Sequence, residues 1–189
     1  DCLLSRGLGD VYKRQALPPA NLVFLVDVSG SMSDNDKLPL VKSSLKMLTK
    51  QLRSQDTISI VTYAGRTQVT LPATKGSDTD KILAAIDSLD ASGSTNGEAA
   101  IKLAYQQAKI HYKKDGINRI LMMTDGDFNV GVSDVDEMLD IIRRERDSGV
   151  SLSTFGFGEG NLNDHMMEQV ADNGNGNYSY CLLYTSELP

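Results

Sequence analysis

Residues 22–32 read LVFLVDVSGSM, an apolar run that ends abruptly in small polar residues. A run such as Leu22–Val26 fits a β-strand that is buried on both faces of a parallel sheet. Asp27, Ser29 and Ser31 follow with alternate spacing, so one carboxylate and two hydroxyls leave the carboxyl end of that strand. These hard oxygen ligands suit Mg²⁺ and do not suit zinc or copper. The stretch therefore predicts a buried strand that ends in candidate metal ligands.

The remainder of the chain alternates between helical and strand patterns. Apolar residues at helical spacing, such as Val41 and Leu45, predict helices with one buried face. The β-branched run TISIVTY at 57–63 predicts a second strand, and 68–71 a short edge strand that ends before Pro72. Further strands are expected over 118–124, 150–157 and 177–180, and further helices from Thr79 or Asp80, over 98–114, after Ser133 or Asp134, and after Asn161 or Asn163. This alternation predicts a Rossmann-like α/β fold: a doubly wound, mostly parallel sheet with helices on both faces and one short antiparallel edge strand.

Length and composition are those of one globular domain. The chain has 189 residues, of which 19 are basic and 25 acidic, for a net charge of −6. That is enough chain to bury a substantial core. The acidic balance argues against a nucleic-acid partner, because phosphate binding relies on patches of Lys and Arg. No apolar run reaches the length of a membrane span, so we expect no direct membrane insertion by this fragment.

The two ends of the chain differ in origin from its middle, in our interpretation. The stretch DVYKRQ at 10–15 and the stretch CLLYTS at 181–186 can be translated from one DNA segment read in opposite orientations. That segment resembles the transposon end used as a sequencing adapter, although two natural peptides could share this relation by chance. We therefore expect residues 1–15 and 181–189 to be non-native, and residues 16–180 to form one domain truncated at its carboxyl end. The two cysteines lie in or beside these ends and say nothing of the redox compartment.

Two further motifs place oxygen ligands at the same predicted edge of the sheet. Thr95 lies in a Gly-Ser-Thr loop before a helix, and Asp125 directly follows a strand. In an open α/β sheet, ligands bind outside the carboxyl ends of the strands. We therefore expect both side chains to join Asp27, Ser29 and Ser31. Mg²⁺ takes six ligands and keeps waters readily, so two carboxylates and three hydroxyls would leave a position open to a ligand's carboxylate.

In this order and spacing, the motifs resemble the metal-ion-dependent adhesion site (MIDAS) of the von Willebrand factor type A (VWA) domain. The stretches ASGSTNG, TDGDFNVG and GFGEGNLND also resemble a bacterial branch of that family, the YfbK-like proteins. The resemblance spans the whole middle of the chain. It implies that Ser29, Ser31 and Thr95 bind a metal through their hydroxyls. It also implies that Asp27 and Asp125 bind the metal directly or through water.

The same resemblance implies a function. The expected ion is Mg²⁺, with Mn²⁺ or Ca²⁺ as alternatives, and an acidic side chain of a protein ligand would take its open position. The chain is then a protein-binding, adhesion-type module and not an enzyme. Asp127 and Asn129 are close by in the sequence and are candidate ligand contacts. The bacterial branch implies a location in the cell envelope, exported or membrane-tethered in the full-length protein, and we expect this fragment to be a monomer.

Less specific interpretations stay open at these positions. Asp27 and its two serines could form a hydrogen-bonded turn without an ion. Thr95 could be a helix cap, and Asp125 could merely stabilise its own turn. A phosphoryl-transfer hydrolase of the haloacid-dehalogenase-like type would use Asp27 as its nucleophile, but it needs a second Asp where Ser29 stands. A structural domain with a vestigial metal site is the third alternative.

Overall fold

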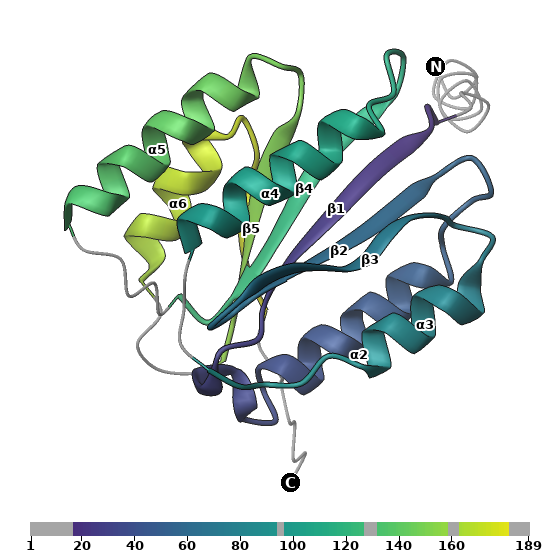
Figure 1. Ribbon diagram of the computed structural model, residues 1–189, viewed down its shortest axis with the longest axis horizontal. Helices are drawn as coiled ribbons and strands as arrows, with labels where there is room; N and C mark the ends of the chain where they lie inside the picture. Colours follow the sequence, from purple (N-terminus) through teal and green to yellow (C-terminus); the bar gives the residue numbers. More distant parts are fainter. Residues whose placement is uncertain (1–16, 94–96, 127–131, 159–162, 182–189) are drawn as a thin grey trace, which may run out of the picture.

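The structure, a computed structural model, describes residues 17–93, 97–126, 132–158 and 163–181. Within those ranges it contains one six-stranded sheet with helices on both faces (Figure 1). The strands are β1 (Ala20–Asp27), β2 (Thr57–Tyr63), β3 (Thr67–Lys75), β4 (Ile117–Thr124), β5 (Ser151–Phe157) and β6 (Tyr178–Cys181). The helices are the 3₁₀ turn η1 (Gly30–Ser33), α2 (Leu38–Thr49), α3 (Thr79–Asp87), α4 (Gly97–Ile110), α5 (Val132–Arg146) and α6 (Asp164–Asn173).

The strand order β3-β2-β1-β4-β5-β6 places β1 inside the sheet. β1 runs parallel to β2 and β4, with Asp27 beside Tyr63 and Val26 beside Met123. Strands β4, β5 and β6 are also parallel, and β2–β3 is the antiparallel pair among the described strands. These pairings confirm the predicted α/β fold class. The carboxyl ends of β1 and β4 flank the point where the strand order reverses, which is the usual ligand position in an open α/β sheet.

Two apolar cores lie on the two faces of the sheet. In β1, Val23 and Leu25 face the layer of α4, α5 and α6, whereas Phe24 and Val26 face the layer of α2 and α3 (Figure 1). None of these four side chains has exposed surface, as a strand packed on both faces requires. Packing from both sides therefore holds the carboxyl end of β1, and with it Asp27, in place.

The edge strand is longer than its sequence predicts. The prediction is a strand over 68–71 that stops before Pro72, whereas β3 continues through Pro72 to Lys75. β3 lies at the edge of the sheet, and its register with β2 shifts between Ile58 and Ile60. An edge position and a bulge both tolerate the missing N–H of a proline. The predicted end of this strand is therefore wrong.

Helix α4 is shorter than the helix predicted over 98–114 and ends at Ile110. The side chain of Asn118, at the start of β4, accepts a hydrogen bond from Lys113 N at 2.9 Å and donates one to Lys113 O at 2.8 Å. Asparagine side chains often satisfy backbone groups in this way, in competition with helical hydrogen bonds. The chain therefore leaves the helix in a turn that Asn118 holds.

Asp56 ties the start of β1 to the turn before β2. Its carboxylate accepts hydrogen bonds from Ala20 N at 2.9 Å, Arg53 N at 2.9 Å and Arg53 Nη2 at 2.8 Å. Burial alone would raise the pKa of Asp56, but these hydrogen bonds and the Arg53 charge outweigh burial and lower the pKa to about 2. The folded state therefore favours the ionised carboxylate.

Replacing Asp56 by asparagine is expected to lower the free energy of unfolding at pH 7 by about 2 kcal/mol. Because the folded pKa lies below the unfolded one, this contribution is present above about pH 4 and is lost as the pH falls towards 2. Urea unfolding of both proteins between pH 7 and pH 3 measures the difference. The control is Asp87→Asn, which removes an exposed ion pair with Lys46 and should leave stability unchanged. A difference independent of pH would contradict the prediction.

Candidate metal centre at the carboxyl edge of the sheet

The turn after β1 gathers the first candidate ligands. Asp27 is fully buried, and its Oδ1 accepts a hydrogen bond from Ser29 N at 2.8 Å. The 3₁₀ turn η1 then brings Ser31 back towards Ser29, so that the two hydroxyl oxygens lie 3.0 Å apart. One carboxylate and two hydroxyls therefore converge within a single turn of chain.

The neighbouring strand β4 supplies the second carboxylate. Thr124, its last residue, donates a hydrogen bond from Oγ1 to Asp27 Oδ2 at 3.1 Å and accepts one from Gly126 N at 3.1 Å. Gly126 has a φ of 80°, a conformation that glycine adopts without strain, and the chain turns sharply there. Asp125, between them, has a side chain that is only 4% exposed. Thr124 therefore joins the two strand ends and orients Asp27.

Lys37 lies at the same edge, one residue before α2. Its Nζ donates hydrogen bonds to Asp125 Oδ2 and to the Ser31 carbonyl oxygen, both at 3.0 Å. Partial burial alone would lower the pKa of Lys37, but the hydrogen bond and the charge of Asp125 outweigh it and raise the pKa. The amine is therefore a cation at neutral pH.

The site concentrates negative charge in a buried place. Burial raises the pKa of Asp27, the hydrogen bonds from Ser29 and Thr124 oppose that rise, and the nearby charge of Asp125 adds to it. Burial, and then the charge of Asp27, raise the pKa of Tyr63 well above its usual value, so its hydroxyl keeps its proton. At this edge a divalent cation would relieve the repulsion between the two carboxylates.

The structure brings together four of the five predicted ligands: Asp27, Ser29, Ser31 and Asp125. Thr95 lies outside the described residues, as do the candidate ligand contacts Asp127 and Asn129. The loop before Thr95 does reach the site, because Gly30 N donates to Gly93 O at 3.1 Å and Ser92 N donates to Val28 O at 2.7 Å. The metal-binding role of all five residues stays a prediction.

The donor set fits a hard divalent ion. Among the described residues, no three His, Cys, Asp or Glu side chains group closely enough to hold a metal, so two carboxylates and hydroxyls are what this edge offers. Mg²⁺ and Mn²⁺ accept such oxygen ligands and complete their shells with water, whereas zinc favours histidine and cysteine. The arrangement therefore suits magnesium-type coordination with open positions.

Sequence reasoning missed two residues of this edge. Thr124 was visible in the strand-end motif Thr-Asp-Gly, directly before Asp125, but its link to Asp27 depends on the pairing of two strands. Lys37 carries no comparable signal, because a lysine in a polar loop is ordinary. Its contact with Asp125 joins residues that are 88 positions apart.

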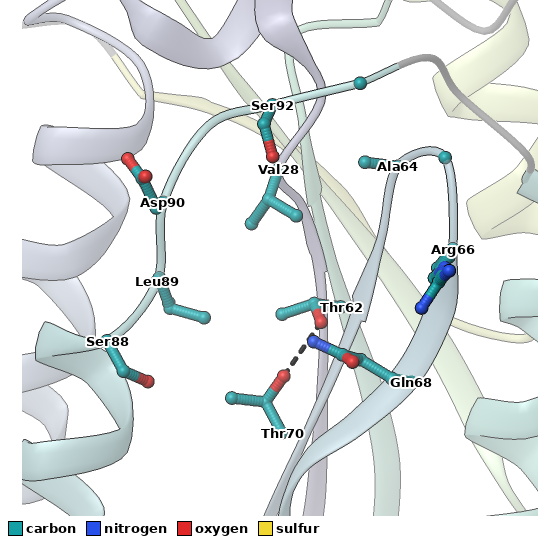
Figure 2. A pocket seen from close by; sticks show the side chains of 12 residues that line it. Val28, Thr62, Ala64, Arg66, Gln68, Thr70, Ser88, Leu89, Asp90 and Ser92 are labelled. Carbon is teal, nitrogen blue, oxygen red and sulfur yellow. Dashed lines mark hydrogen bonds between the residues drawn. The ribbon is translucent and has the colours of Figure 1, made fainter.

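A pocket of about 520 Å³ opens beside the candidate metal centre (Figure 2). Its volume lies within the range of about 300–1,000 Å³ that is usual for ligand sites. Val28 lies in its floor, and Thr62 and Thr70 share a hydrogen bond of 2.8 Å on its strand wall. Arg66 on the β2–β3 hairpin and Asp90 on the 88–93 loop stand on opposite walls. The pocket therefore offers an apolar base and charges of both signs.

Comparison with known proteins identifies the family of this domain. Residues 21–187 match the family model of the von Willebrand factor type A domain. The chain is 58% identical over 168 residues to the uncharacterized protein YfbK of Escherichia coli (strain K12). The matched residues make up 89% of this chain and 29% of that protein. An aerotolerance-related membrane protein from Bacteroides fragilis shares the fold with a TM-score of 0.72 and 22% identity, over 86% of this chain and 91% of that one. The manganese-loaded TRAP protein of Plasmodium vivax also shares the fold, with a TM-score of 0.68 and 22% identity. That match covers 87% of this chain and 68% of the TRAP chain.

The chain therefore belongs to the von Willebrand factor type A domain family, and to its bacterial YfbK-like branch, which confirms the predicted family. Domains of this family are generally protein-interaction modules and not enzymes, and they commonly bind a divalent metal. The chain spans 29% of the length of YfbK. In the part of the chain that the structure describes, none of the helices has the length and apolar character to cross a bilayer.

Proposed function

We propose that this domain binds a divalent cation, Mg²⁺ in the first place, and through it a carboxylate of a protein ligand. The residues that would hold the ion are Asp27, Ser29, Ser31, Thr95 and Asp125. When bound, the ion supplies a Lewis-acid position at which a ligand's carboxylate oxygen can coordinate. The observation that carries the proposal is the convergence of two hydroxyl oxygens, 3.0 Å apart, with two buried carboxylates from neighbouring strands.

Charge supports a divalent ion at this edge. Asp27 and Asp125 bring two negative charges, and Lys37 is the cation that contacts Asp125 among the described residues. Buried charge without compensation is unfavourable, so the site gains from a further cation. The manganese-loaded TRAP protein, which shares the fold, is in line with a metal at this site.

The pocket beside the metal centre would receive the part of the ligand next to its carboxylate. Arg66 and Asp90 offer a donor and an acceptor across the pocket, above the apolar side chain of Val28. This combination suits an extended peptide, whose backbone and side chains carry both kinds of group. Asp127 and Asn129, which follow Asp125 in the sequence, would contribute ligand contacts.

The cell envelope is the proposed place of the full-length protein, exported or tethered to a membrane. The fold is shared with an aerotolerance-related membrane protein from Bacteroides fragilis. The fragment would act as a monomer and meet its protein ligand at the carboxyl edge of the sheet.

Electron paramagnetic resonance of Mn²⁺ tests both halves of the proposal. Titration of the protein into Mn²⁺ should remove the free-ion signal with one ion bound per chain. Addition of N-acetylaspartate with a ¹³C-labelled side-chain carboxylate should then give a ¹³C coupling to the bound ion, whereas N-acetylasparagine, labelled at the amide carbon, should not. An undiminished free-ion signal would contradict the metal site. A bound ion without carboxylate coupling would contradict the ligand half alone.

A further inference from the structure

The ammonium group of Lys37 lies beside Asp125 in the candidate site. It contacts Asp125 Oδ2 and the Ser31 carbonyl oxygen, both at 3.0 Å, and lies 4.0 Å from the carboxylate of Asp34. The Lys37 side chain is 17% exposed, whereas that of Asp125 is 4% exposed. The lysine therefore forms a largely enclosed, charge-assisted pair with one of the proposed metal ligands.

The packing around the lysine stem keeps the ammonium group in this place. Gly158 follows β5 with a φ of 90°, and a Cβ there would come within 2.6 Å of Lys37 Cε and 2.7 Å of its Cγ. The bare glycine thus leaves room for the stem, which packs against the backbone just after β5. The packed stem and the two hydrogen bonds of the ammonium group together direct that group at Asp125.

We propose that Lys37 is the tethered counter-cation of the metal centre, which competes with the divalent ion for Asp125 and so sets the affinity of the site. This inference rests on the metal site of the proposed function. Without metal, the ammonium group adds a positive charge beside the buried carboxylate of Asp125, which lowers the cost of burying that negative charge. When a divalent ion approaches, two cations contend for the same carboxylate, and their repulsion drives the lysine away.

Measurement of the dissociation constant for Mn²⁺ in Lys37→Met tests this role. Methionine keeps an unbranched side chain that can pack beside Gly158 and removes the competing charge. We expect the variant to bind Mn²⁺ about tenfold more tightly than the wild type, the scale of one charge-assisted hydrogen bond. The metal-free variant should melt at a lower temperature than the wild type, because Asp125 loses its counter-charge.

Lys46→Met is the matched control. Lys46 lies on α2, the helix that follows Lys37, and pairs with the exposed Asp87, so this variant loses the same single charge away from the site. Its affinity for Mn²⁺ should equal that of the wild type. An equal gain in both variants would assign the effect to net charge and would overturn the proposal.

Chemical labelling follows the displacement directly. Acetic anhydride should modify Lys37 slowly in the metal-free protein and several-fold faster with saturating Mn²⁺, as mass spectrometry of the digested protein reports. Lys46 should react at the same rate in both states. A Lys37 rate that does not rise with metal would overturn the displacement.

The outcomes separate this inference from the proposed function. If the wild type binds Mn²⁺ and Lys37→Met binds it no more tightly, the counter-cation role fails and the metal site stands. If Lys37→Met binds more weakly, Lys37 holds Asp125 in place for the ion, which also overturns the proposal. If neither protein binds Mn²⁺, both the metal site and the role of Lys37 fail.

Discussion

Asp27→Asn is expected to abolish the stabilisation of this domain by Mn²⁺ or Mg²⁺, while the metal-free variant becomes more stable than the wild type. A hundredfold excess of ion over its dissociation constant should stabilise the wild type by about 2.7 kcal/mol, or about 5–10 °C in Tm for a domain of this size. Asparagine keeps an oxygen for Ser29 N, which donates to Asp27 Oδ1 at 2.8 Å, but it brings no negative charge. The metal response should therefore vanish while the fold persists.

The gain without metal follows from the pKa of Asp27. Burial raises this pKa, so the folded chain holds the proton more firmly than the unfolded chain does. The ionised carboxylate therefore opposes folding. Its cost in free energy of unfolding is absent below about pH 4 and grows as the pH rises through the raised pKa. Thermal melts in EDTA from pH 4 to pH 8 should show the advantage of the variant increasing with pH.

Asp115→Asn is the control for both measurements. Asp115 is exposed in the turn before β4, at the opposite edge of the sheet, and its replacement removes the same charge. This variant should melt with the wild type in EDTA and should keep the full response to Mn²⁺. A metal-induced rise in Tm that survives in Asp27→Asn would show that the ion binds somewhere else.

Phe24→Ala should cause the largest loss of stability among these substitutions. Phe24 lies in the middle of β1, has no exposed surface and packs into the core under α2 and α3. Truncation of a buried aromatic side chain removes apolar contacts and leaves a cavity, which typically costs about 3–5 kcal/mol. Urea unfolding monitored by circular dichroism should show this loss at an unchanged m-value.

Met47→Ala provides the matched control for this core substitution. Met47 belongs to α2, but its side chain is 65% exposed, so its truncation should change the free energy of unfolding by less than about 0.5 kcal/mol. A loss below about 1 kcal/mol in Phe24→Ala would contradict the assignment of β1 as a strand packed on both faces.

The pattern of strands and helices was predictable because its signals are local. Five apolar residues in a row, as in Leu22–Val26, fit a strand covered on both faces, and the structure covers β1 from both sides. The ends of elements were less predictable. The edge strand continues past Pro72 because an edge position tolerates a proline. Helix α4 ends at Ile110, where the side chain of Asn118 hydrogen-bonds the backbone that follows. Both effects depend on neighbours that are distant in the sequence.

The part of the candidate site that lies directly after the strands was predictable from the sequence. Asp27 and Asp125 each come directly after an apolar strand, and parallel strands present their carboxyl ends at one edge. The order of strands in the sheet makes β1 and β4 neighbours. The packing of the whole core selects that order. Thr95 lies outside the described residues, and the bound ion stays a prediction.

The sequence by itself determined the fold class and which polar residues leave the strands, because apolar spacing and short motifs act within a few residues of chain. The tertiary structure alone decided that Thr124 holds Asp27 across 97 positions and that Lys37 reaches Asp125 across 88. These contacts require a particular strand register and a confined side chain. Both arise only when distant segments pack against each other.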